Sequence, residues 1–166
     1  MRLADSLLQE LAMEAATTRR VLERVPEGQM TWPPAEKART LGQLAMHVAT
    51  TPGGVASLAS SSPAQVPPFA DEPAAATTGA ILAALDESVA QAQALVGAMD
   101  DEALLATWRL QAGEREILAM PRIAFLRSIM LNHWYHHRGQ LSVYLRLLGV
   151  PLPSIYGPSA DENPFI

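Results

Sequence analysis

Residues 121–148 read PRIAFLRSIMLNHWYHHRGQLSVYLRLL, and this stretch predicts one long helix at the end of the chain. Pro121 suits a first helical turn, where its missing N–H leaves no bond unmade, and Gly149 with Pro151 ends the helix. At about 100° per residue, one face is apolar and the opposite face is polar. The face expected in the core carries Leu126, Met130, His137, Leu141, Tyr144 and Leu148, with His133 beside it. The face expected in solvent carries Ser128, Tyr135, Arg138, Ser142 and Arg146.

Three further helices are predicted upstream, over residues 3–25, 41–60 and 78–98. Thr40 is a good N-cap, and Gln43 completes a capping box that sets the start of the second helix at Leu41. The TPGG run at 51–54 is expected to kink or interrupt that helix, because proline removes a backbone donor.

Two long connections join these helices. The Pro-rich segment 60–76 is long for a turn between antiparallel neighbours and suits a crossover between the second and third helices. Residues 99–118 look irregular, with a small hairpin around Ala112 and Gly113. Four long helices with such connections predict an all-α four-helix bundle in a single domain, residues 1–166.

Composition narrows the function classes. The chain has 166 residues, a formal net charge of −5 and no cysteine. An acidic chain is a poor partner for nucleic acid, and without cysteine there is no thiolate nucleophile or thiolate metal ligand. No signal peptide or membrane-spanning stretch stands out, so we expect a cytoplasmic protein without membrane contact.

The histidines are the main chemical signal. Three of the four, His133, His136 and His137, lie within five positions of the last helix. The i, i+4 spacing of His133 and His137 places two imidazoles one above the other, and His47 of the second helix would supply a third ligand. Such a site leaves an open position where a metal acts as Lewis acid or activates water. The i, i+3 pair of His133 and His136 would also fit one metal ion, but His136 lies at the edge of the apolar stripe, so the burial pattern favours His137.

The residues around the histidines do not fit other known histidine sites. A zincin needs glutamate where Trp134 stands, and a ferritin-like di-iron site needs it where Leu44 and Met130 stand. No nucleophile elbow of a serine hydrolase is present. Histidines that are only hydrogen-bonded in the core stay an alternative. We also expect Gln140, one turn after His137, to be able to bond a ligand imidazole.

The runs HHRGQLSVYLRLLGVPLPSIYGPSADE (136–162), LGQLAMHVA (41–49) and TWPP (31–34) together resemble the DinB family of DinB/YfiT-like metalloenzymes. The resemblance extends over essentially the whole chain. It implies a four-helix bundle in up-down-down-up order, commonly dimeric. It also implies a three-histidine metal site, which falls here on His47, His133 and His137.

The resemblance implies a divalent metal cofactor, with nickel or zinc first and iron or manganese as alternatives. It points to a metal-dependent enzyme, such as a thiol-dependent S-transferase or a hydrolase, acting on a low-molecular-weight thiol or another small molecule. The alternative is a non-catalytic, stress-related homodimer in which the metal is structural, and a helical module for apolar ligands ranks last. No catalytic side chain beyond the three ligands is predicted.

Overall fold

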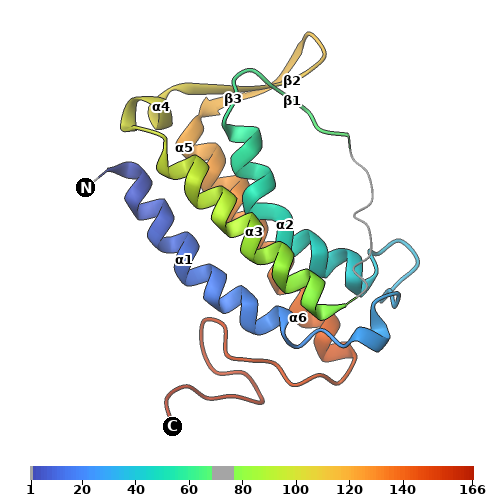
Figure 1. The fold of residues 1–166 in the computed structure, drawn as a ribbon. Coiled ribbons are helices and arrows are strands. Elements are labelled where there is room, and N and C mark those ends of the chain that lie inside the picture. The colour runs from blue at the N-terminus through green and yellow to red at the C-terminus, as the bar shows by residue number, and fades with distance from the viewer. Residues whose placement is uncertain (1, 69–76) are drawn as a thin grey trace.

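The computed structural model describes residues 2–68 and 77–166 of the chain. Long helical segments pack side by side and dominate the fold (Figure 1). These are α1 (Leu3–Leu22), α2 (Leu41–Ala59), α3 (Thr78–Gly97) and a continuous last stretch formed by α5 (Arg122–Phe125), η2 (Leu126–Asn132) and α6 (His133–Leu147). Short helical turns lie at η1 (Glu27–Gln29) and α4 (Asp101–Leu105).

The expectation of an all-α fold is wrong in one respect, because three short strands form a small sheet at one end of the helices (Figure 1). β2 (Thr107–Ala112) and β3 (Arg115–Pro121) make the hairpin predicted around Ala112 and Gly113. β1 (Ala64–Gln65), at the start of the crossover, pairs parallel with β2. Only β1 lies in a segment for which no strand was predicted, and β3 extends to Pro121, which the sequence assigned to the start of the last helix.

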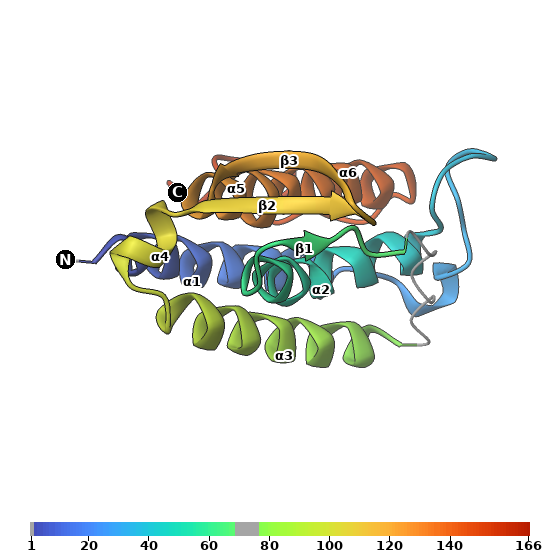
Figure 2. The same cartoon turned by 90° about the horizontal axis from the view of Figure 1, so that it is seen from above.

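The helices form three layers. Figure 2 shows α3 on one side, α1 and α2 in the middle, and α5 with α6 on the other side beside the sheet. The chain runs one way along α1 and α6 and the opposite way along α2 and α3 (Figures 1 and 2). The second helix is thus in the middle layer and contacts both α3 and α6.

Helix α2 begins where its capping signal predicts. The Thr40 hydroxyl accepts the Gln43 N–H, and the Gln43 side chain accepts the Thr40 N–H in return. TPGG does not end the helix: α2 continues to Ala59 with Pro52 inside it, close to the predicted end at about residue 60. Neighbouring side chains take up the backbone groups around the proline: the Trp134 indole donates to the Val48 carbonyl, and Gly53 N–H donates to the Ser88 hydroxyl.

The last helical stretch is not the uniform α-helix that was predicted. Residues Leu126–Asn132 are π-helical, and a regular α-helix resumes at His133. A π segment turns less per residue, so one helical wheel cannot describe both halves. Within α6 the buried positions are Trp134, Arg138, Leu141 and Leu145. Arg138 was therefore wrongly placed in solvent, because α1 and the C-terminal tail cover that side of the helix.

A single cluster of buried apolar side chains runs through all the layers, from Leu7 and Leu11 of α1 to Leu141 and Leu145 of α6. None of the helices in the described ranges combines the length and apolar character required to cross a membrane.

Candidate metal centre

Helices α2 and α6 bring three of the four histidines to one point. His47 lies in the second turn of α2, and His133 and His137 lie on consecutive turns of α6. One imidazole nitrogen from each of the three lies within 4.8 Å of the other two. The structure thus brings together the three residues that the sequence selected as metal ligands, and each is half-buried.

The rings are packed edge to face rather than stacked. Ring centroids are 4.4 Å apart for His47–His137 and His133–His137, and 5.3 Å apart for His47–His133. The closest approach joins the Nε2 atoms of His133 and His137, at 2.7 Å. This separation requires a proton or another cation between the two nitrogens, because two bare lone pairs would repel at that distance.

Gln140 fixes the tautomer of His137. Its Oε1 lies 2.7 Å from Nδ1 of His137. An amide oxygen only accepts, so Nδ1 carries the hydrogen and Nε2 presents its lone pair towards His133 and His47. The expected bond from Gln140 to a histidine of the cluster is present, and its partner is His137. This is the arrangement in which an outer partner orients a metal-binding histidine.

The three imidazoles are held neutral. Burial lowers the pKa of His47 to about 4, and repulsion from the Arg39 charge and from any proton on His133 adds to the effect. Burial also lowers the pKa of His137 to about 4, with Gln140 opposing the shift. The pKa of His133 is lowered by burial, then by His136 and Arg39, while a backbone bond with Ile129 raises it. Neutral imidazole is the form that binds metal, so the site needs no deprotonation near neutral pH.

The donor set fits a divalent metal ion. Tetrahedral coordination at Zn–N distances of about 2.0–2.1 Å separates neighbouring nitrogens by roughly 3.3 Å. His133 and His137 would therefore move apart by well under 1 Å, which is within the reach of small side-chain rotations. Three imidazoles suit zinc, nickel, copper or iron and leave a further position open.

An open pocket of about 710 Å³ adjoins the cluster, with His47 and His133 in its wall. The rest of its wall comes from the following turns of α2 and the first residues of the crossover, among which hydroxyl and small apolar side chains alternate: Thr50, Thr51, Gly54, Val55, Ser57, Leu58, Ser61 and Pro67. A volume of several hundred Å³ accommodates a small molecule. A ligand in this pocket would reach the histidines directly.

Other residues singled out in the sequence lie elsewhere. His136 is exposed on α6, with its ring 5.0 Å from that of His137, and is not one of the three converging residues. Trp32 packs edge-on against Tyr144, and the Tyr156 hydroxyl accepts a hydrogen bond from Arg138. Neither side chain lines the pocket beside the histidines. The sequence did not predict that Trp134 donates a hydrogen bond to the Val48 carbonyl. A signal was present, because Pro52 has no N–H and leaves that carbonyl without its donor within the helix.

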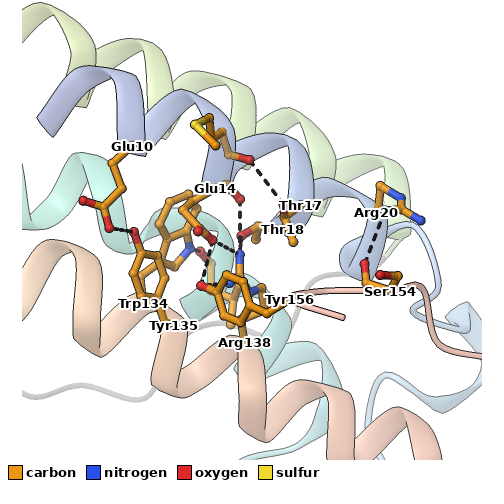
Figure 3. A network of polar contacts seen from close by, with 12 residues as sticks. Glu10, Glu14, Thr17, Thr18, Arg20, Trp134, Tyr135, Arg138, Ser154 and Tyr156 are labelled. Carbon is orange, nitrogen blue, oxygen red and sulfur yellow. Dashed lines mark hydrogen bonds and ion pairs between the residues drawn. The ribbon is translucent and has the colours of Figure 1, made fainter. Parts of the chain in front are cut away.

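The other side of α6 holds a different polar cluster (Figure 3). The guanidinium of Arg138, almost fully buried, forms an ion pair of 2.6 Å with Glu14 of α1 and donates to the Thr18 hydroxyl. Its second nitrogen donates to the Tyr156 hydroxyl of the tail, which donates to Glu14 in turn. The acids of the tail pair with other arginines, Asp161 with Arg146 and Glu162 with Arg20.

Fold and site together define a helical protein with a three-histidine cluster beside an open pocket. The family model of the DinB family matches residues 1–163 of the chain. The chain therefore belongs to the DinB family, as the resemblance in its sequence indicated.

Solved structures show the same fold. A DinB-like protein from Bacillus cereus ATCC 10987 superposes with a TM-score of 0.72 at 23% identity, over 92% of this chain and 97% of that one. YfiT from Bacillus subtilis superposes with a TM-score of 0.65 at 18% identity, over 88% and 87% of the two chains. YfiT is described as a probable metal-dependent hydrolase with an unusual four-helix bundle topology.

A curated relative is the uncharacterized protein YrdA of Bacillus subtilis (strain 168), 43% identical over 37 residues. The matched stretch spans 22% of this chain and 22% of YrdA.

Proposed function

We propose that this protein is a divalent-metal-dependent enzyme that acts on a small molecule bound in the pocket beside the histidines. The observation that carries the proposal is the convergence of three neutral imidazoles from two helices, two of which, His47 and His133, line an open pocket. His47, His133 and His137 would hold the metal. Bound there, a divalent ion acts as a Lewis acid and lowers the pKa of bound water towards 7.

Hydrolysis is the reaction that the fold relatives favour, since YfiT is described as a probable metal-dependent hydrolase. Transfer to a low-molecular-weight thiol is the second reaction that we propose. The thiol would have to come from outside the protein, because the chain has no cysteine. The hydroxyls of Thr50 and Ser57 can bond polar groups of a substrate, while Val55 and Leu58 cover its apolar parts. Nickel or zinc is the proposed ion, and iron or manganese the next choice.

A structural metal is the competing role, since an ion at this site would join α2 to α6. Those helices are already joined at the same level by the bond from Trp134 to Val48. The pocket in contact with His47 and His133 also favours a ligand-binding role over a closed structural site.

The test is elemental analysis of protein purified without chelator, followed by assays on the metal-loaded form. We expect about one divalent ion per chain, and ester or amide hydrolysis or thiol transfer that disappears with chelator and returns with metal. A protein that neither retains nor takes up a divalent ion would overturn the proposal. Retention of metal without turnover, with a large loss of melting temperature on chelation, would favour the structural role.

Three expectations about the protein in its surroundings stay proposals. We propose a homodimer, a cytoplasmic location and small-molecule rather than nucleic-acid partners, on the family resemblance and the net charge of −5. Sedimentation of the purified protein tests the first of these.

A further inference from the structure

Pro52 leaves a backbone acceptor open in the middle of α2. In an α-helix the carbonyl of residue i accepts the N–H of residue i+4. Residue i+4 of Val48 is Pro52, which has no N–H, and yet α2 continues for two more turns to Ala59. Both Val48 and Pro52 are buried, so water is a poor replacement for the missing donor.

Trp134 supplies the donor from the other helix. Its indole Nε1 lies 2.7 Å from the Val48 carbonyl oxygen, and its side chain is fully buried. Trp134 directly follows His133, and Val48 directly follows His47. The hydrogen bond therefore joins the neighbours of two converging histidines that lie on different helices.

A second contact holds the opposite side of α2 at the same level. Gly53 N–H donates to the buried Ser88 hydroxyl of α3 at 2.8 Å. A Cβ on Gly53 would lie 2.9 Å from the Ser88 carbonyl oxygen, so only glycine allows this close approach of the two helices. The Pro52–Gly53 step thus fixes α2 against α6 on one side and against α3 on the other.

We infer that Pro52 and Trp134 are positioning residues for the histidine centre: the proline frees the Val48 carbonyl, and the indole uses it to hold His133 and His137 in register with His47. A slip of one helix past the other by a single residue would move His47 by 1.5 Å along the axis. The inference rests on the proposed metal site for its main measurement and has a second measurement that needs no metal.

The first variant is Trp134→Phe, which removes the N–H and keeps an aromatic ring in the core. Metal affinity, measured by competition with a chromophoric chelator using Zn²⁺ and Ni²⁺, is expected to fall between about 10- and 100-fold, the range for lost outer partners of metal ligands. The melting temperature of the metal-free protein is expected to fall by about 5 °C, because the Val48 carbonyl is left without a donor.

Trp108→Phe is the matched control. Trp108 is equally buried and donates through Nε1 to the Ser61 carbonyl at 2.8 Å, but it lies on β2 and does not join the two histidine helices. This variant is expected to lose a similar amount of melting temperature and to keep its metal affinity within about twofold, as expected for separate sites.

The double variant Pro52→Ala/Trp134→Phe separates positioning from stability. Alanine restores the N–H that bonds Val48 inside α2, so the melting temperature is expected to recover while the metal affinity stays low. Recovery of both quantities, or an unchanged affinity in Trp134→Phe, would overturn the inference. It is also overturned if Trp108→Phe weakens metal binding as much as Trp134→Phe.

NMR of the metal-free protein tests the positioning role of Pro52 and Trp134 separately from the proposed metal binding. Cross-relaxation between the His47 and His133 rings is expected in the wild type and in Trp108→Phe, and is expected to be lost in the double variant. If the wild type takes up no Zn²⁺ or Ni²⁺, the metal proposal fails, but loss of this signal still supports the positioning role. A double variant that keeps the signal overturns it.

Discussion

Helix α6 separates two polar clusters of opposite character. On the side of α2, His133 and His137 point their ring nitrogens at each other and at His47. On the side of α1, Arg138 meets the carboxylate of Glu14 and the hydroxyl of Tyr156 (Figure 3). Residues 137 and 138 are neighbours in the sequence, and yet one belongs to each cluster.

The two clusters differ in how they are completed. In the Arg138 cluster the guanidinium bonds the Thr18 and Tyr156 hydroxyls and the Glu14 carboxylate, and the charges of Arg138 and Glu14 balance within the protein. In the histidine cluster, Gln140 directs the lone pair of His137 towards two other imidazoles, the arrangement that the proposed metal ion would complete. A buried network that satisfies itself contributes specificity and stability, whereas converging lone pairs prepare a binding site. The comparison predicts that substitutions on the two sides of α6 change different properties.

The largest effect is expected for His133→Ala on metal binding. Loss of one of three imidazole ligands is expected to weaken Zn²⁺ or Ni²⁺ binding by about three orders of magnitude, on the order of 4 kcal/mol. The free energy of unfolding of the metal-free form is expected to change by less than about 1 kcal/mol, because the ring is only half-buried. Chelator competition and urea denaturation measure the two quantities.

His136→Ala is the matched control on the same helix, since His136 is exposed and lies outside the converging set. It is expected to retain full metal binding. Equal loss in both variants would show that the histidines act through helix stability, and the contrast between the two sides of α6 would then disappear.

On the other side of α6, Glu14→Ala is expected to change stability instead. It leaves the buried Arg138 guanidinium without its carboxylate, and breaking a buried pair in this way costs about 3 kcal/mol of unfolding free energy. Metal affinity is expected to stay within about threefold, since Glu14 lies across the helix from the histidines. Urea denaturation with chelator present measures the first effect, and chelator competition the second.

Glu10→Ala provides the control for this substitution. Glu10 accepts a hydrogen bond from the Tyr135 hydroxyl and forms an ion pair of 3.3 Å with Arg127. The side chains of Glu10 and Arg127 are both substantially exposed. A loss below about 1 kcal/mol is expected for such a surface pair. If Glu14→Ala cost no more than Glu10→Ala, the Arg138 cluster would not be the stabilising element that its burial indicates.

The histidine side of α6 was predictable from the sequence, and the arginine side was not. Helical spacing selects His133 and His137, and the Thr40 capping box sets the position of His47 on its helix. Both are local rules that need only a few neighbouring residues. Placing Arg138 requires knowing that α1 and a tail without regular structure pack over that side, which no helical pattern encodes.

The continuation of α2 through Pro52 could not be predicted for a related reason. Proline predicts a break in α2 because its lost bond is a local property. The compensating donor, Trp134, lies 86 residues away in sequence, so the helix survives through a tertiary contact. The sheet could be predicted only in part. The turn at Gly113 predicts the hairpin, whereas β1 has only two residues and forms by pairing with β2.

A smaller effect on metal binding is expected from Gln140→Ala. Without Oε1, the Nδ1–H of His137 loses the partner that fixes its tautomer, and metal affinity is expected to fall roughly 10-fold. Gln140→Glu keeps an acceptor and makes it anionic, so it is expected to retain or raise the affinity. Because Gln140 is exposed, neither change is expected to alter the melting temperature of the metal-free protein. Equal metal affinities in Gln140→Ala and Gln140→Glu would show that Gln140 does not influence metal binding.

The smallest effect is expected from Tyr156→Phe, which deletes one hydroxyl from the Arg138 cluster. That hydroxyl accepts from Arg138 and donates to Glu14, so its loss is expected to cost about 1 kcal/mol of unfolding free energy. In a Glu14→Ala background the cost is expected to shrink, because the hydroxyl has lost its acceptor and the three groups act as one network. Urea denaturation of the four members of this cycle gives the coupling energy directly. Additive losses would mean that the Tyr156 hydroxyl acts through its bond to Arg138 independently of Glu14, and the three groups would then not form one network.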